Sequence, residues 1–375
     1  MDGGEGRTGR AGKGSGNKQP RCVKCRDPVF QITRKPKGFM FFIVVASSLV
    51  LLAMNINVNM DKLLYKKIAI LENCSDVIYG LARRRMINLI PPTWAELEAN
   101  FSKTGIQLGG RWKPKNCTSR IHVAIIIPFR DRDSHLRVFL NNMHPFFQKQ
   151  ELDYRIYIVE QKAGTIFNRG LLLNIGFVES AKIDGDAYDC FALHDVDLIA
   201  ENEWNIYNCS EKVKHMAANI SKFKSGLAYE KYSGGVAMFT KWQYTSVNGY
   251  PNTYFGWGGE DDDLYERITN NNNAGFSRVP LDIGRYTMIK HERDSGNPVN
   301  PGRVRQLQSS YKRRKVDGLS GLNGTYTVLK IDEFLLYTRI YVDVDPIAVL
   351  SAIPVNLYGE WELKQMRKWV NKTKS

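Results

Sequence analysis

The chain has 375 residues, of which 43% are hydrophobic and 24% charged, an ordinary composition for a globular protein with a large core. Its formal net charge is +15, with +7 in residues 1–37 and +8 in the rest of the chain. Because the basic excess is concentrated in one tail, the charge does not indicate nucleic-acid binding, although it suits an anionic small substrate.

An uncharged apolar stretch, Gly38 to Met54, follows this tail. It is slightly shorter than the roughly 20 residues that cross a bilayer, and the weakly polar residues behind it supply the rest, so we predict one transmembrane signal anchor over residues 38–58. A buried core helix and a cleaved signal peptide are the alternatives. Nothing amphipathic surrounds the stretch, however, and a preceding region of 37 residues is long for a signal peptide.

The charges that precede the anchor predict its orientation. Ten Lys and Arg residues lie in residues 1–37, so the positive-inside rule assigns this tail to the cytosol and the chain beyond about residue 60 to the lumen. A short span also suits the thinner membranes of the early secretory pathway.

The cysteines and the glycosylation sequons agree with this topology. Two cysteines of the tail, Cys22 and Cys25, have no second pair or histidines nearby and are interpreted as free or lipidated thiols. Four others follow the anchor: Cys74, Cys117, Cys190 and Cys209. An even number in an oxidising compartment predicts two disulfides, with three pairings open. All seven N-x-S/T sequons also follow the anchor, at Asn73, Asn100, Asn116, Asn208, Asn219, Asn323 and Asn371.

The lumenal part divides into a weakly periodic stem over residues 59–105 and a folded domain over residues 106–375. The domain's elements alternate between strand and helix: strand Val123–Ile127, helix Ser134–Gln148, strand 154–161, helix 168–181 and strand 189–197. The β-branched first strand is typical of one that is buried on both faces. The alternation predicts an α/β fold with a largely parallel mixed sheet, which binds its ligands at the carboxyl ends of the strands.

A nucleotide in this domain has to be held by arginines and a metal, because the sequence contains no P-loop. The G-x-G-x-x-G match at Gly4–Gly9 has no strand before it and no helix behind it, so it is low-complexity sequence rather than a dinucleotide site. Arg130, Arg132 and Arg169 are the candidates for a diphosphate site beside a divalent ion, which would neutralise a phosphate leaving group.

Candidate metal ligands occur at two places. Asp195 and Asp197 alternate at the end of the third strand, so both are expected to point to one side, with simple turn capping as the alternative. Met288 and His291 are spaced i, i+3, although each alone is more often a core residue. Carboxylate plus imidazole suits Mn²⁺, for which a methionine is an unusual ligand.

Four consecutive carboxylates, Glu260–Asp263, follow a run of aromatic residues and glycines. A helix start explains one or two of them, because acidic residues suit the positive end of the helix dipole, but four like charges repel. One carboxylate next to an acceptor hydroxyl can remove its proton, while others bind neighbouring hydroxyls. Trp257, between glycines, can stack on a sugar and close over a donor. Together with the metal, these residues indicate glycosyl transfer.

The motifs PFRDR (128–132), FNRGLLLNIGF (167–177), HDVDLI (194–199), YFGWGGEDDDLYERI (254–268) and MIKH (288–291), in this order, resemble the β-1,4-galactosyltransferase family from about Gly109 to Asp345. The resemblance implies a GT-A nucleotide-sugar-binding fold and a single-pass type II Golgi membrane protein. It also implies an inverting, Mn²⁺-dependent transfer of galactose from UDP-galactose. The acceptor would be the 4-hydroxyl of a terminal N-acetylglucosamine or glucose on a glycoprotein or glycolipid.

The resemblance also assigns roles by position. The donor would be bound by Pro128, Phe129, Arg130, Arg132, Phe167, Asn168, Arg169, Asp195, Val196, Lys222 and Trp257. The metal ligands would be Asp197, Met288 and His291. Asp261 would be the catalytic base, with Glu260 beside it, and the acceptor would be bound by Tyr229, Tyr232, Gly258, Gly259, Glu260, Asp261, Asp262 and Arg303. The family's disulfide pairing implies Cys74 with Cys117 and Cys190 with Cys209.

Two positions bear on the substrates. Tyr232 stands where a bulky tyrosine favours galactose in the family and a smaller aliphatic residue admits N-acetylgalactosamine. Val304 stands where members that use N-acetylglucosamine carry an aromatic residue, so glucose or another acceptor stays open. The alternatives are a β-1,4-N-acetylgalactosaminyltransferase that uses UDP-N-acetylgalactosamine and, from another class, a non-catalytic membrane-bound lectin.

Overall fold

The computed structural model describes residues 47–56, 71–75, 78–223, 226–271, 274–292 and 295–372. The chain separates into two units, Met1–Ile70 and Leu71–Ser375. The predicted cytosolic tail, with Cys22 and Cys25, lies outside the described residues.

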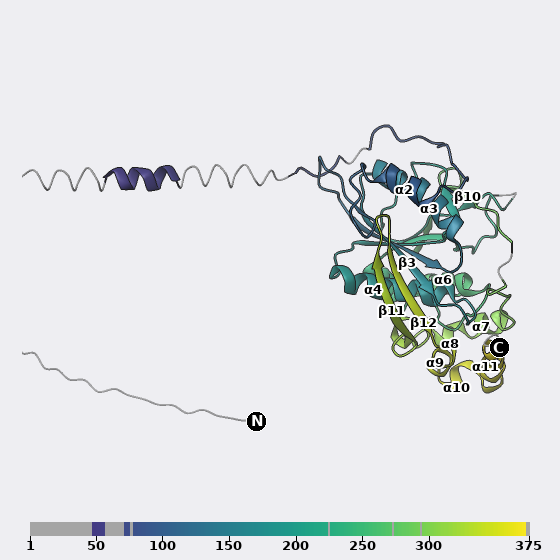
Figure 1. Ribbon diagram of the computed structural model, residues 1–375. Coiled ribbons are helices and arrows are strands. Elements are labelled where there is room, and N and C mark those ends of the chain that lie inside the picture. The colour runs from purple at the N-terminus through teal and green to yellow at the C-terminus, as the bar shows by residue number, and fades with distance from the viewer. Residues whose placement is uncertain are drawn as a thin grey trace, which may run out of the picture. The chain divides into compact units, whose positions relative to one another are not determined.

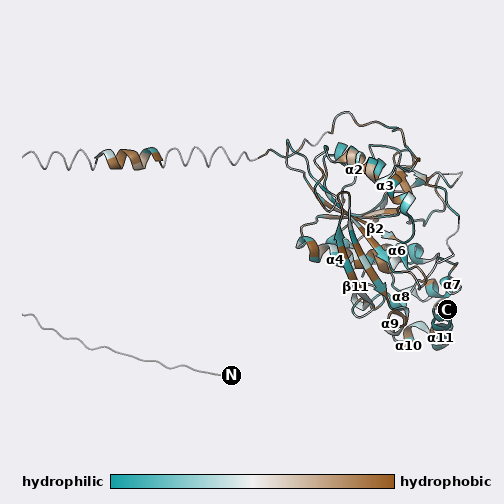
Figure 2. Cartoon of the chain, viewed as in Figure 1, coloured by the Kyte–Doolittle hydropathy of each residue, from teal (hydrophilic) through white to brown (hydrophobic). Residues whose placement is uncertain are grey.

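Part of the predicted anchor is described, as a helix over residues 47–56. This helix is mostly hydrophobic (Figure 2), and its apolar side chains are exposed, Leu49 by 61% and Leu51 by 62%. Among the described residues, no helix combines the length and the apolar character that crossing a membrane requires. Residues 38–46 and 57–58 of the predicted anchor lie outside the described part.

The second unit is built on a mixed sheet of nine strands (Figure 1). Its strands are β1 (Arg111–Trp112), β2 (His122–Phe129), β3 (Asp153–Gln161), β4 (Cys190–His194), β6 (Val213–His215), β8 (Val236–Thr240), β9 (Phe276–Arg278), β11 (Tyr326–Glu333) and β12 (Thr338–Val344). The order is β11-β12-β3-β2-β4-β8-β6-β9, with β1 paired to β3. The four central strands, β12, β3, β2 and β4, run parallel, as predicted, whereas β11 and β8 join them antiparallel.

Strand β2 is buried on both faces because helices cover both sides of the sheet. Ile125 and Ile127 belong to the core beneath α3 (Asp133–Lys149), while Ala124 and Ile126 belong to the core beneath α4 (Arg169–Asp184). Gly176 lets α4 approach the sheet closely, since a Cβ at this position would lie 2.3 Å from the Cγ2 of Ile126. The β-branched run therefore predicted this strand correctly.

A second sheet has three strands in the order β5-β10-β7: β5 (Leu198–Ala200), β10 (Arg285–Met288) and β7 (Asn219–Ile220). The remaining described helices are α2 (Trp94–Phe101), α5 (Lys241–Ser246), α6 (Glu260–Thr269), α7 (Arg303–Gln308), α8 (Ser310–Arg313), the 3-10 helix η1 (Leu319–Gly321), α9 (Pro346–Ser351), α10 (Val355–Tyr358) and α11 (Glu360–Lys372). Helices α8 to α11 gather at one end of the unit (Figure 1). The antiparallel pairing of β5 with β10 matters most for the site described below.

The second unit begins before the predicted domain boundary. Helix α2, within the segment predicted as the stem, lies beside α3 (Figure 1) and contributes the buried Leu97 and Phe101 to the core. The two disulfides join Cys74 to Cys117 and Cys190 to Cys209, which confirms the pairing that the family resemblance implied.

Candidate active site

The candidate site lies at the carboxyl ends of β2 and β4, where an α/β sheet binds its ligands. Strand β4 ends at His194, so Asp195 to Asp197 form a turn after the strand rather than its last residues. The other segments of the predicted site start or end nearby in the fold: Pro128–Arg130 at the end of β2, Phe167–Arg169 at the start of α4, Lys222 after β7 and Gly258–Asp262 at the start of α6.

Asp197 and His291 lie together although they are far apart in the chain. The antiparallel pairing of β5 with β10 sets Met288 opposite Leu198, the residue after Asp197, and the Ile289 N–H donates to the carbonyl of Asp197 at 2.8 Å. The Nε2 of His291 is 3.2 Å from the Oδ2 of Asp197. This hydrogen bond raises the pKa of His291.

The contacts of His291 suit a metal ligand. Its Nδ1 lies 2.7 Å from the carbonyl of Glu292, an arrangement that fixes the ring and directs Nε2 towards the carboxylate of Asp197. One carboxylate oxygen and one imidazole nitrogen thus converge on one point, with the half-buried Met288 on the neighbouring strand. This donor set fits a divalent cation such as Mn²⁺.

On the predicted donor side, Arg130 and Asn168 make bonds that shape the site. The buried Arg130 donates to the carbonyls of Thr165 and Gly296 at 2.6 and 2.8 Å, and its guanidinium lies over the ring of Phe167. Asn168 caps α4 by accepting from the N–H of Leu171 at 3.0 Å. Their side-chain polar groups therefore bind the protein itself and hold the loops that border the site.

Arg169 joins the two halves of the predicted site. Its Nε donates to Oδ1 of Asp195 at 2.6 Å, and its Nη1 donates to Oδ1 of Asp261 at 2.7 Å. Glu260 lies 3.7 Å from the same Nη1, and the guanidinium stacks over the ring of Tyr250. One half-buried cation thus links the carboxylate after β4 to the acidic start of α6. Sequence reasoning assigned Arg169 to the diphosphate and did not foresee this second contact.

Two carboxyl groups of this cluster have raised pKa values. Burial raises the pKa of Glu260 to about 8, the charge of Asp261 adds to the shift, and Arg169 opposes it. Burial likewise raises the pKa of Asp195 to about 7 against the attraction of Arg169. The Oε2 of Glu260 has no hydrogen-bond partner among the described residues. Buried carboxyl groups with perturbed pKa values are typical of functional sites.

The four consecutive carboxylates have different partners. Gly258 and Gly259, with φ of 104° and 96°, turn the chain into α6 in a conformation that favours glycine. Asp261 accepts from Arg169 and, at 3.1 Å, from the Tyr250 hydroxyl. Asp262 accepts from the Tyr229 hydroxyl at 2.8 Å, near the surface.

Asp263 instead points into the core, where it is fully buried. It accepts from the Nε of Arg267 at 2.7 Å and from the Tyr254 hydroxyl at 2.9 Å, and the Nη2 of Arg313 lies 3.4 Å away. The repulsion that the sequence implied is therefore relieved by three arginines on opposite sides of the run, Arg169 at the site and Arg267 and Arg313 in the core. Asp263 is a structural residue.

Tyr232 lies between the donor and acceptor sides. Burial raises its pKa, and the nearby charges of Asp261 and Asp195 add to this shift. A Cβ at Gly234 would lie 2.4 Å from the Oδ2 of Asp261 and 3.0 Å from the Tyr232 hydroxyl, so the absence of a side chain there leaves space beside both groups. Gly234 and Tyr250 were missed from the sequence. The two consecutive glycines after Ser233 were the signal that could have indicated Gly234, whereas no local sequence feature indicated Tyr250.

Trp257 and Arg303 border the same region. Trp257 is 52% exposed, while its backbone N–H donates to the carbonyl of Pro298 at 2.8 Å. Arg303 packs against Gly258 and Gly259, where added Cβ atoms would lie 3.1 and 3.2 Å from its side chain. Lys222 is exposed, and its ammonium lies over the ring of Phe223. The exposed indole is available as a stacking surface for a sugar.

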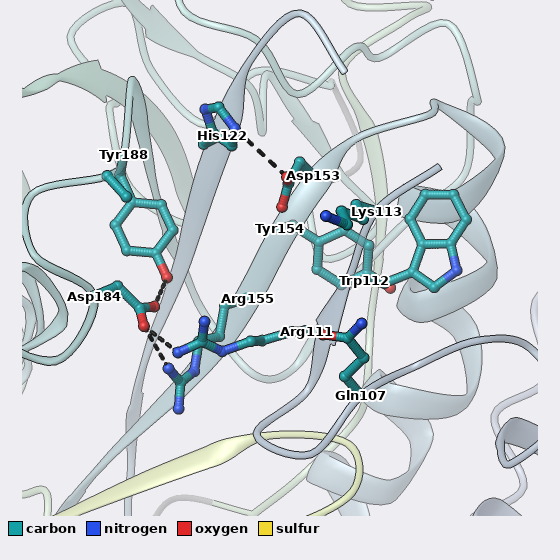
Figure 3. A pocket seen from close by; sticks show the side chains of 11 residues that line it. Gln107, Arg111, Trp112, Lys113, His122, Asp153, Tyr154, Arg155, Asp184 and Tyr188 are labelled. Carbon is teal, nitrogen blue, oxygen red and sulfur yellow. Dashed lines mark hydrogen bonds and ion pairs between the residues drawn. The ribbon is translucent and has the colours of Figure 1, made fainter. Parts of the chain in front are cut away.

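A separate pocket of about 250 Å³ lies at the amino ends of β2 and β3, far along the strands from this site (Figure 3). Its centre is the carboxylate of Asp184, which binds Arg111, Arg155, Tyr157 and Tyr188. Because the acid is fully paired, we interpret this cluster as a buried structural network.

Comparisons with known proteins agree with the fold and the site. Residues 74–210 match the family model described as the N-terminal region of glycosyl transferase group 7, and residues 214–292 match the one described as the N-terminal domain of galactosyltransferase. The fold and the site are thus those of a glycosyltransferase.

Relatives narrow this class. The chain is 42% identical over 275 residues to β-1,4-galactosyltransferase 2 of Mus musculus, covering 73% of each. It is 45% identical over 239 residues to β-1,4-galactosyltransferase 1 of the same species, covering 64% of this chain and 59% of the relative. A mutant of Drosophila β-1,4-galactosyltransferase 7, solved with manganese, UDP-Gal and xylobiose, is 27% identical with a TM-score of 0.51, and the match covers 64% of this chain and 97% of that one. The chain belongs to the β-1,4-galactosyltransferase family.

Proposed function

We propose that this protein transfers galactose from UDP-galactose, with inversion and with Mn²⁺ bound, to the 4-hydroxyl of a terminal N-acetylglucosamine or glucose on a glycoprotein or glycolipid. The observation that carries the proposal is the pair of bonds from Arg169 to Asp195 and Asp261, at 2.6 and 2.7 Å. They set the predicted donor-side and acceptor-side carboxylates around one half-buried cation. The relative solved with manganese, UDP-Gal and xylobiose supports the choice of donor and metal.

Asp197, His291 and Met288 would hold the metal, which would supply positive charge to the leaving diphosphate. The Asp197 and His291 side chains already lie 3.2 Å apart, so little rearrangement is required of them. Arg169 adds a fixed guanidinium beside Asp195 on the donor side. Trp257 offers its exposed indole to the sugar.

Asp261 would remove the proton of the acceptor hydroxyl. Its Oδ1 is held by Arg169 and Tyr250, whereas its Oδ2 faces the space beside Gly234. Glu260, with a pKa of about 8, carries its proton at neutral pH and can donate a hydrogen bond to an acceptor oxygen. Asp261 would thus accept the proton of the hydroxyl, while Glu260 would position the sugar by donating a hydrogen bond to it.

Donor choice provides the first test. The full chain, assayed with Mn²⁺ and N-acetylglucosamine or glucose, is expected to prefer UDP-galactose, because the family resemblance assigns Tyr232 to the position where a bulky residue excludes the N-acetyl group of the donor. Tyr232→Leu removes that bulk, and the rate with UDP-N-acetylgalactosamine should rise by about 10–200-fold, the range that pocket size alone provides. Mass spectrometry and NMR of the product give the sugar and its linkage.

Tyr229→Leu is the matched control, because Tyr229 contacts the ring of Tyr232 but binds Asp262. It should not admit the larger donor. A wild-type protein that already prefers UDP-N-acetylgalactosamine would identify the runner-up transferase instead. A protein that binds sugars but transfers none with any of these donors would be the lectin.

We further propose that the protein is a single-pass type II protein of the Golgi membrane with its catalytic unit in the lumen. The uncharged stretch from Gly38, the basic tail before it and the seven sequons beyond it support this topology. The two disulfides of the second unit suit an oxidising compartment. In sealed Golgi vesicles, added protease should remove an epitope on residues 1–37 and spare one at the C-terminus. Loss of the C-terminal epitope without detergent would refute the orientation.

A further inference from the structure

His135, in the first turn of α3, is a buried side chain whose ring makes no hydrogen bond to the described residues. It is 8% exposed, and neither ring nitrogen has a hydrogen-bond partner among the described residues. A buried polar group left unpaired destabilises the folded state, so such a group calls for an explanation.

The other buried histidines of the described chain are fully paired. His144 lies on the same helix, with Nδ1 2.7 Å from the Tyr154 hydroxyl and Nε2 2.9 Å from the carbonyl of Leu336. His194 and His215 also have partners at both ring nitrogens. His135 is the exception, and its ring lies beside that of the candidate metal ligand His291.

The ring of His135 meets the ring of His291 edge to face, with centroids 5.6 Å apart and an interplanar angle of 85°. Asp197 and Arg132 are close enough to interact with it electrostatically. The ring of His135 therefore lies beside the two side chains that converge at 3.2 Å, Asp197 and His291. A cation held there, with the oxygens bound to it, would supply the partner that the ring lacks.

We propose that His135 is a further binding residue of the metal centre, which contacts the ion or an oxygen atom bound to it. This inference rests on the proposed function, because it takes Asp197 and His291 as the ligands. It explains why an unpaired imidazole is kept in a buried position. Groups that support a metal from just outside its ligand set typically contribute 10–100-fold to its affinity.

The test measures Mn²⁺ affinity of the full chain by the electron paramagnetic resonance signal of the free ion, with and without UDP. His135→Phe keeps an aromatic ring and removes both nitrogens, so the dissociation constant of Mn²⁺ should rise by about 10-fold or more. Its resistance to denaturant should stay the same or increase, because an unpaired buried polar group is gone. His144→Phe, the matched control on the same helix, should lower stability and leave Mn²⁺ affinity unchanged.

The possible outcomes separate this inference from the proposed function. If folded His135→Phe binds Mn²⁺ as the wild type does, while Asp197→Ala has lost binding, His135 has no part in the centre. If Asp197→Ala itself binds normally, the proposed metal site is wrong. His135→Leu serves if the phenylalanine variant does not fold, because leucine has no polar side-chain atom either, and wild-type affinity in it would equally overturn the inference. Pulsed electron paramagnetic resonance of bound Mn²⁺ counts the imidazole nitrogens that coordinate the ion. Two such nitrogens would show that His135 binds the ion directly, and one would indicate that it contacts an oxygen bound to the ion.

Discussion

Asp261→Asn should lower kcat by about 10²–10⁴-fold while leaving UDP binding within about twofold of the wild type. An amide retains the shape of the carboxylate and can still accept from Arg169 and Tyr250, which bind its Oδ1. It cannot take a proton from the acceptor hydroxyl. Steady-state kinetics with saturating UDP-galactose and acceptor, together with calorimetry of UDP binding, measure both quantities.

Tyr250→Phe is the control for this prediction. It removes one hydrogen bond to Asp261 and leaves the carboxylate in place, so we expect a loss of about 5–10-fold, the equivalent of one ordinary hydrogen bond. If Asp261→Asn keeps most of its turnover, the base lies elsewhere in the cluster, and Glu260 becomes the residue to test.

Asp263→Asn should reduce the free energy of unfolding by about 3–5 kcal/mol, the cost of breaking a buried ion pair by removing one partner. The substitution leaves the buried Arg267 without the charge that compensates it, whereas Arg313 keeps its ion pair with Asp317. Activity per folded molecule should change little, because Asp263 faces the core. Denaturant titrations and active-site-normalised rates measure the two effects.

The matched control is Glu266→Gln on the same helix. Glu266 pairs with Lys231 at 3.0 Å on the surface, where such a pair contributes at most about 1 kcal/mol. An Asp263 variant as stable as the Glu266 variant would contradict the structural role. An Asp263 variant that is as stable as the wild type but inactive would show that Asp263 has a role in the active site.

The sequence predicted the central part of the fold because the signals there are local. The β-branched run of β2 and the apolar helices α3 and α4 each carry their own periodicity, and the structure confirms them within a few residues. The antiparallel flanks of the sheet carry no such signal. Strand β6 has three residues, and its partners β8 and β9 are distant in the chain, so its place depends on tertiary packing.

The sequence predicted which residues belong to the site, but not which partners each of them contacts. The sequence alone does not distinguish the four consecutive acids, but helix periodicity directs Asp263 towards Arg313, which is 50 residues away in the chain. The same applies to Arg169, whose contact with Asp261 spans 92 residues. Such partners are set by the tertiary structure. The roles that the family resemblance gave to the site residues stay predictions, which the variants above examine.

The pairing of β5 with β10 links metal binding to the stability of the folded protein. Asp197 lies in the segment that matches one family model and His291 in the segment that matches the other, 94 residues further along the chain. A cation between them would act as a removable cross-link, present only when both segments have folded. Bound metal would then stabilise the native state against unfolding, and a chelator would lower the stability of the protein as well as abolish its activity.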